Sequence, residues 1–171
     1  MNKKYWKYSV IILLGGVLAL SFFYWREKSC WNILEKNISW NSMEPLIFSW
    51  DKLSLNIGYY NCHDLERGDL IAYDFANSWE LYIKILYGFP WDKIFFKNSK
   101  LFINNKVLIN SIWKEYVFSK EEEKLISLYI FNWLLKKWSY LIFWDNISNS
   151  SDSRKFWWIW KKDIVGKFYF K

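Results

Sequence analysis

Histidine and cysteine are the residues that this chain has least of among those that usually build metal and catalytic sites. Its 171 residues include one histidine, His63, and two cysteines, Cys30 and Cys62. A zinc site takes three or four protein ligands, largely from these residue types, and no Cys-x-x-Cys pair is present. We therefore expect no metal and no cofactor. A serine nucleophile would have only one histidine available as its base, so we expect any serine chemistry to use a different base.

Charge is absent from residues 8–25, eighteen uncharged residues in a row. This is about the minimum length of a transmembrane helix. Three lysines precede the stretch and a mixed cluster follows it, which by the positive-inside rule predicts residues 1–7 in the cytoplasm and residues 26–171 outside. The alternative is a cleaved secretory signal, with Ala19-x-Ser21 as its cleavage site. We favour an uncleaved anchor, because the apolar run continues past that site.

The net charge of +7 lies largely at the N-terminus. Four of the 24 basic residues and none of the 17 acidic ones fall in positions 1–26, so the remaining chain carries only +3. No basic tract there is longer than two residues. We interpret the charge as a topology signal and a mildly basic surface near anionic membrane lipid, and expect no nucleic-acid partner.

The two cysteines both fall in the portion expected outside the cytoplasm, where a disulfide is permitted. Nothing in the sequence places Cys30 near Cys62. Unpaired thiols are the expectation, and the sequence leaves the redox state open.

The exported segment has mostly the pattern of β-strands. Short alternating or apolar runs between turn residues predict strands over 52–58, 69–75, 81–86 and 140–143, and a hairpin over 101–109 with Asn104-Asn105 at its turn. One helix interrupts them: Ser119-x-x-Glu122 is a capping box, and apolar residues follow at near-helical spacing. The predicted fold is mostly β, with one N-terminal transmembrane helix, then a single β domain with a helical insertion at about 119–137.

Ser42 and Lys84 are the candidate catalytic residues. In an extended strand, Lys84 shares a face with Tyr82 and Leu86. Full burial there would lower the lysine pKa by as much as ~3–5 units, and a neutral amine can accept a serine proton. The alternative for Lys84 is a buried stem with a solvated ammonium, and for Ser42 a turn cap.

Residues 145–154 form a polar segment rich in Asp, Asn and Ser. Such side chains hydrogen-bond nearby backbone and can order a loop. Asp152 is placed to pair with Arg154, and a serine hydroxyl in this segment to orient an amine. The alternative is a solvated, flexible loop, which composition alone does not reject.

Several motifs stand in order along the exported segment: Ser42-Met43-Glu44-Pro45, Phe48-Ser49-Trp50-Asp51, residues 67–73, residues 82–92, residues 145–154 and Ile164-Val165-Gly166-Lys167. Together they resemble the bacterial type I signal peptidases, membrane-bound serine proteases with a Ser-Lys dyad. In the lysine motif, glycine, proline and aspartate follow Lys84 by four, six and eight positions. The chain departs from the family at Ile85, where an arginine is expected, and we assign that position no role.

The resemblance implies a role for each matching residue. Ser42 would be the nucleophile, with its backbone N–H in the oxyanion hole, and Lys84 the general base. Ser150 matches the serine that orients the lysine. Asp152 and Arg154 match the structural pair that supports its loop.

Tryptophan stands where the family has glycine at Trp40, Trp50, Trp91, Trp144 and Trp157, although some members have serine at the first. The chain has 14 tryptophans and only 6 glycines, about 3.5 % glycine against about 7 % on average. Glycine in turns supplies positive φ or close approach. We hypothesise that UGA codons, which some bacterial lineages decode as glycine, have been translated here as tryptophan. The alternative is an aromatic surface at the membrane interface.

The resemblance implies removal of N-terminal signal peptides from exported preproteins at the outer face of the cytoplasmic membrane. Preproteins and membrane lipid are the expected partners, and we assume a monomer. Two alternatives stay open. One is a related Ser-Lys protease acting on other surface proteins, and the other is a degenerate, non-catalytic membrane-anchored member, which genuine tryptophans would favour.

Overall fold

The structure is a computed structural model that describes residues 30, 32–74, 81–148, 152–156 and 158–170. The predicted anchor at residues 8–25 lies outside this part of the chain, and so does Ser150. Among the described residues, no helix has the length and apolar character needed to cross a membrane.

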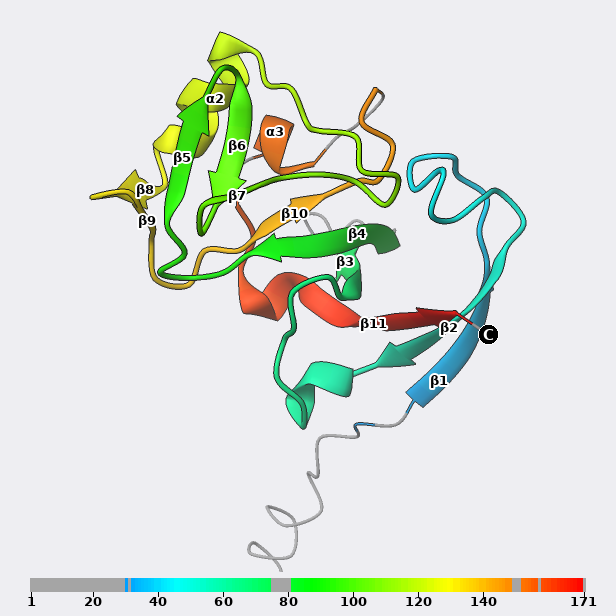
Figure 1. Cartoon of the computed structure of the whole chain (residues 1–171). Helices are drawn as coiled ribbons and strands as arrows, with labels where there is room; N and C mark the ends of the chain where they lie inside the picture. Colours follow the sequence, from blue (N-terminus) through cyan, green and yellow to red (C-terminus); the bar gives the residue numbers. More distant parts are fainter. Residues whose placement is uncertain (1–29, 31, 75–80, 149–151, 157, 171) are drawn as a thin grey trace, which may run out of the picture.

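A six-stranded sheet forms the larger part of the domain (Figure 1). Its strands are β1 (Asn32–Asn37), β2 (Lys52–Ile57), β3 (Leu70–Asp74), β4 (Leu81–Gly88), β10 (Leu141–Phe143) and β11 (Ile164–Phe170). Their spatial order is β1-β2-β11-β3-β4-β10, and every neighbouring pair is antiparallel. The C-terminal strand β11 therefore lies in the interior of the sheet, between β2 and β3.

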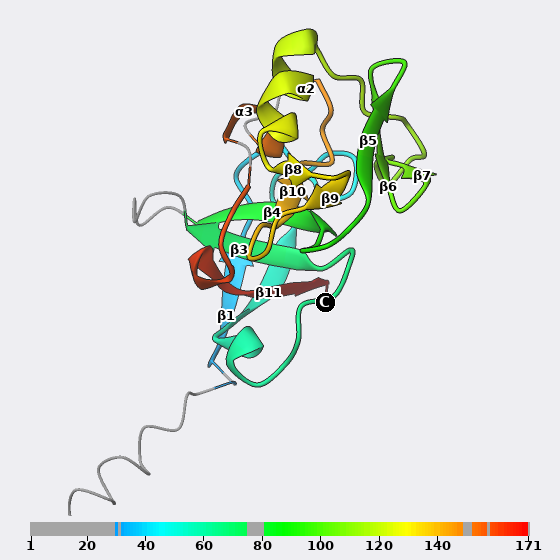
Figure 2. The ribbon, with the colours of Figure 1, turned by 90° about the vertical axis from the view of Figure 1, so that its left-hand side faces the viewer.

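A smaller unit packs at the β4–β10 side of this sheet, as the two ribbon views show (Figures 1 and 2). Its elements are β5 (Ile94–Lys97), β6 (Lys100–Ile103), β7 (Lys106–Val107), α2 (Lys120–Ser127), β8 (Ile130–Phe131), β9 (Leu134–Leu135) and α3 (Ser153–Phe156). Two short 3-10 turns complete the described elements, η1 (Tyr59–Asn61) and η2 (Lys161–Asp163).

Strand alternation divides the core of the large sheet between its two faces. On β3, Leu70 and Ala72 pack into one apolar cluster, whereas Ile71 and Tyr73 pack into another. This is the period-two pattern that a sheet covered on both faces requires. A third cluster, which includes Phe143 of β10, fills the space beneath the smaller unit.

The predicted strands are confirmed, with ends that agree or differ by one or two residues, and so is the Asn104-Asn105 hairpin between β6 and β7. Strands β1 and β5 were missed, and β8 and β9 lie where a helix was predicted. All six residues of β1 are exposed, so this edge strand has no burial pattern to reveal it. β5 follows the Pro90 turn directly and is only four residues long.

The predicted helix at 119–137 is too long. The capping box at Ser119 and Glu122 is confirmed, but α2 ends at Ser127. The chain then forms the β8–β9 hairpin instead, with Asn132 and Trp133 both at positive φ in its turn. Leu135 of β9 is hydrogen-bonded to the turn that follows β4, since its N–H donates to Asp92 O at 2.9 Å.

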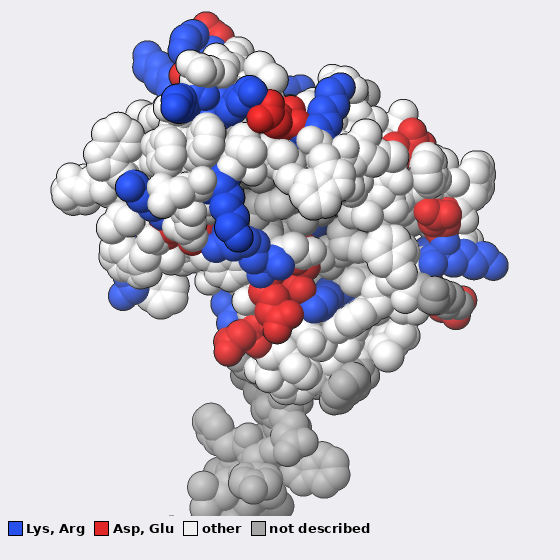
Figure 3. Space-filling model, in the orientation of Figure 1, with Lys and Arg blue, Asp and Glu red and all other residues white. Residues whose placement is uncertain are grey.

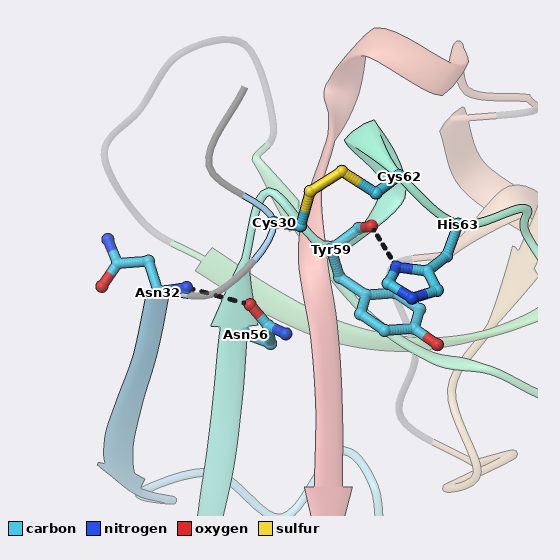
Figure 4. Close-up of a disulfide and its surroundings, with 6 residues drawn as sticks. All are labelled: Cys30, Asn32, Asn56, Tyr59, Cys62 and His63. Atoms are coloured by element: carbon cyan, nitrogen blue, oxygen red, sulfur yellow. Dashed lines mark hydrogen bonds between the residues drawn. A yellow bond between two sulfur atoms is a disulfide. The ribbon is translucent and has the colours of Figure 1, made fainter. Parts of the chain in front are cut away.

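The expectation of unpaired thiols is wrong. Cys30 and Cys62 form a disulfide with their Cα atoms 5.9 Å apart, within the normal range (Figure 4). Beside it, Asn32 N–H at the start of β1 donates to the Asn56 Oδ1 of β2 at 3.2 Å. The bridge thus joins the segment before β1 to the end of η1.

Basic and acidic side chains lie side by side on the face seen in Figure 3. Ion pairs of the domain include Arg67 with Asp92 and Lys100 with Glu115. The mild positive charge of the domain is therefore mixed with negative charge across this face.

Candidate active site

Lys84 lies in the middle of β4 with its side chain buried at 1 % exposure. It stands opposite Ile71 of β3, so the strand on that side shields it from water. Burial lowers the pKa of the Lys84 ammonium from its ordinary 10.5 to about 7, while the negative charge of Asp152 acts in the opposite direction. The sequence left a buried and a solvated Lys84 amine both open, and the structure shows the buried one.

Two aromatic rings surround the Lys84 amine. Its Nζ lies 4.8 Å from the ring centroid of Tyr82 and 4.2 Å from that of Trp144. The Trp144 indole itself is poorly satisfied, because its buried Nε1 has no hydrogen-bond acceptor among the described residues. The Trp144 ring therefore covers the amine, while its own indole N–H stays without an acceptor among the described residues.

Ser42 lies half-buried in a tight turn that follows β1. Glu44 N–H donates to Asn41 O at 3.2 Å across this turn. The next residue, Met43, is fully buried and packs with Ile83 and Ile85 of β4 in one apolar cluster. The residue that follows the serine thus anchors the turn against the strand that carries the lysine.

The segment from Trp144 to Asn146 connects the two candidates. Asn146 N–H donates to Ser42 O at 3.0 Å, and its side-chain amide donates to Asn41 O, also at 3.0 Å. Two residues earlier, Trp144 contacts Lys84. The structure therefore brings the serine turn and the buried lysine to the same short segment.

Asp145 organises this segment, and no role was predicted for it. Its buried carboxylate accepts hydrogen bonds from the N–H of Leu46 at 3.2 Å and from the N–H of Ser111 at 2.8 Å. The Ser111 hydroxyl donates to it as well, and the Asn110 amide donates to the Asp145 carbonyl at 3.1 Å. The only sequence signal was the position of Asp145 at the end of an apolar strand, and nothing marked Asn110 or Ser111.

Asp152 and Arg154 form a buried ion pair, the pairing that the sequence suggested. The Arg154 Nε donates to Asp152 Oδ1 at 2.9 Å and its Nη2 to Oδ2 at 2.8 Å. Asp152 also accepts from Trp144 N–H at 3.2 Å, and Arg154 donates to Ile147 O at 2.9 Å. The pair therefore fixes the described ends of the loop in which Ser150, outside the described residues, was predicted to act.

The turn after the lysine strand is fixed by Asp92. Its carboxylate accepts from Phe89 N–H at 2.7 Å and pairs with Arg67 at 2.9 Å. Two of the sequence motifs, residues 67–73 and 82–92, are thus joined directly.

A histidine base is not available at this place. His63 stacks on Tyr59, with ring centroids 4.0 Å apart, next to the Cys30–Cys62 disulfide (Figure 4).

An amine whose pKa is near 7 is half neutral at neutral pH, so Lys84 can accept a proton from a nearby hydroxyl. The arrangement is therefore suited to nucleophilic attack by a serine that a lysine activates.

Comparison with known proteins finds a matching family and several similar proteins. The family described as "Signal peptidase, peptidase S26" matches residues 4–171. Signal peptidase IB of Staphylococcus aureus (strain COL) is 29 % identical over 143 residues, which cover 78 % of this chain and 74 % of that protein. Signal peptidase I P of Bacillus subtilis subsp. natto is 33 % identical over 127 residues, covering 73 % and 69 %. A crystal structure of a signal peptidase I from Enterococcus faecalis V583 matches with a TM-score of 0.41 and 18 % identity, covering 61 % of this chain and 97 % of that one.

Proposed function

Because the chain belongs to the signal peptidase family of S26 peptidases, we propose that it is a serine endopeptidase that removes signal peptides from exported preproteins. The observation that carries this proposal is Lys84, a buried amine with its pKa lowered to about 7. By its sequence motif it resembles the family's lysine, and it lies beside the segment that holds the Ser42 turn.

In the proposed mechanism, neutral Lys84 takes the proton of the Ser42 hydroxyl as the oxygen attacks the scissile carbonyl. The Ser42 N–H donates to the oxyanion that forms, and a donor of this kind is worth about 3–4 kcal/mol in other serine proteases. Protonated Lys84 then gives its proton to the leaving amine. Water, activated by Lys84, hydrolyses the acyl-enzyme and restores both residues.

Supporting roles follow from the neighbours of the dyad. Ser150 would orient the lysine amine, and the buried Asp152–Arg154 pair would hold the loop that carries it. The preprotein would lie extended along a strand edge beside the site, with small side chains at the first and third positions before the cut. The proposed anchor at residues 8–25 would hold the site at the outer face of the cytoplasmic membrane, where such substrates emerge.

The direct test is cleavage of a purified preprotein by the full chain and by its Ser42→Ala and Lys84→Met variants. We expect each substitution to abolish processing and to leave the circular dichroism spectrum unchanged. Ser49→Ala is the matched control, since this serine lies in the next turn, and it should retain activity. Processing by either dyad variant would contradict the assignment.

One observation favours a second candidate, a non-catalytic family member that binds preproteins. The Trp144 ring lies on the Lys84 amine and would obstruct proton transfer if tryptophan is the native residue. A serine-directed covalent probe distinguishes the candidates, because a catalytic Ser42 is labelled and an inactive one is not.

A further inference from the structure

Five tryptophans adopt a backbone conformation that side chains of their size avoid. The φ angle is positive at Trp50 (78°), Trp91 (71°), Trp113 (63°), Trp133 (65°) and Trp138 (69°). The other described non-glycine residues with positive φ are four asparagines and one serine, and none is a phenylalanine or a tyrosine. Positive φ brings Cβ close to the backbone, which glycine avoids and asparagine tolerates best. Aromatic character alone therefore does not explain the pattern.

Trp91 occupies the glycine position of a type II turn. Asp92 N–H donates to Phe89 O at 3.0 Å, which makes Pro90 the second residue of the turn and Trp91 the third. Positive φ at the third residue alone defines type II, where glycine is the preferred residue and proline often precedes it. The local sequence thus fits Pro-Gly better than Pro-Trp.

Trp50 and Trp138 are the third residues of two further turns of this kind. Their closing hydrogen bonds are Asp51 N–H to Phe48 O at 3.1 Å and Ser139 N–H to Lys136 O at 3.2 Å. In both turns the second residue lacks positive φ, so both are type II and both call for glycine at the third position.

Trp133 occupies the glycine position of a hairpin turn. Asn132 and Trp133 both have positive φ between the paired strands β8 and β9, which is the type I′ arrangement. Asn-Gly is the preferred pair in this turn. The same chain uses Asn104-Asn105, two residues that tolerate positive φ, in its β6–β7 turn.

Trp113 closes a turn at its fourth residue. Its N–H donates to Asn110 O at 3.1 Å, and the Asn110 N–H donates to Lys114 O at 2.9 Å. Glycine is favoured at the fourth position of a type I turn, and here that residue also has positive φ.

Packing does not compensate for the unfavourable backbone. The five side chains are 57–81 % exposed, so little indole surface is removed from water. An aromatic surface for membrane binding would require the side chains to share one face of the domain. What these five residues share is instead a position of positive φ in a turn, each in a separate turn.

We propose that positions 50, 91, 113, 133 and 138 are glycine in the protein as its own cell makes it, through decoding of UGA as glycine. The family resemblance pointed to two of these positions, 50 and 91. The backbone selects the same two independently and adds 113, 133 and 138, for which the resemblance gave no indication. This proposal does not depend on catalytic activity.

The deciding experiment is to read the five codons in the source gene and to sequence the native protein by tandem mass spectrometry. We expect UGA in the gene and glycine in the peptides at all five positions. UGG codons, or tryptophan in the native peptides at these positions, would overturn the proposal.

A second experiment tests the backbone argument on the recombinant full chain. Trp50→Gly, Trp133→Gly and Trp138→Gly should each raise the midpoint of thermal unfolding by about 2–8 °C, whereas alanine at the same sites, which keeps a Cβ, should raise it less. Trp160→Gly is the matched control, because Trp160 is also exposed but has φ −93°. Equal effects of glycine and alanine, or a gain at position 160 as large as at the other three, would contradict the assignment.

Discussion

Lys84 should set the pH dependence of catalysis. Its pKa is lowered to about 7 by burial, and only the neutral amine can act as the base. We therefore expect kcat/KM for preprotein cleavage to rise with pH up to about 7 and to level off above it. A pH–rate profile of the full chain between about pH 5 and 9 checks this, because a base with this pKa titrates within that range. A rate that still rises steeply at about pH 9, as for a base with the ordinary lysine pKa of 10.5, would mean that the buried Lys84 amine is not the base.

Trp144 is the residue whose replacement should most increase activity. Trp144→Gly removes a ring 4.2 Å from the Lys84 amine and a buried Nε1 that has no acceptor among the described residues. We expect kcat to increase by about tenfold or more, since small displacements of a catalytic group have effects of this size. Trp158→Gly is the control, because Trp158 packs on Tyr129 instead and should give no increase. A lower kcat in Trp144→Gly would show that the indole supports the site.

These two residues show what the sequence could reveal about the site. Strand alternation and the apolar neighbours of Lys84 made its burial one of two interpretations, and they did not exclude a solvated ammonium. The contact between Lys84 and Trp144 was not predictable, because it depends on how strand β4 and a segment sixty residues later pack against each other. Asp145 was overlooked for the same reason.

The Cys30–Cys62 disulfide stabilises the region around β1, an edge strand with no buried residue. It closes a loop with a sequence separation of 32 residues. Cys62→Ser should therefore lower the free energy of unfolding by about 3–4 kcal/mol, from the lost restriction of the unfolded chain. Denaturant titration measures the loss, and Cys30→Ser and the double variant should show the same value. A double variant much less stable than either single one would mean that the thiols act separately.

The β8–β9 hairpin shows why one element was predicted incorrectly. Leu125, Leu128 and Leu135 continue a helical spacing, and no glycine interrupts it. With glycine at position 133 the sequence would contain Asn-Gly, the strongest short hairpin signal, at the observed turn. The helix prediction failed because the sequence has tryptophan at position 133, where glycine would have indicated the turn. β1 was missed for a different reason, since a wholly exposed strand leaves no pattern.

The order of motifs along the chain predicted the domain better than it predicted how the motifs meet. Residues 67–73 and 82–92 are joined by the Arg67–Asp92 pair, and the Ser42 turn meets the 145–154 segment through Asn146. Such contacts between distant segments are set by sheet topology, and periodicity within one segment carries no information about them.

Asp145 provides the sharpest test of how far the site depends on these distant contacts. Its carboxylate receives hydrogen bonds from Leu46, four residues after Ser42, and from Ser111. In Asp145→Ala, those donors lose their acceptor, at a cost of about 1–3 kcal/mol for each group left unsatisfied. We expect a lower free energy of unfolding and a reduced kcat.

The acid limb of the pH–rate profile should nevertheless stay near 7 in Asp145→Ala, because burial of Lys84 on β4 causes that pKa. Asp163→Ala is the matched control: its carboxylate accepts an exposed hydrogen bond from the Trp160 N–H, so stability should change by no more than about 0.5 kcal/mol. A shifted acid limb in Asp145→Ala would mean that the Ser42 turn also shields the Lys84 amine from water. An unchanged kcat would show that the turn holds Ser42 in place without the help of residues 110, 111 and 145.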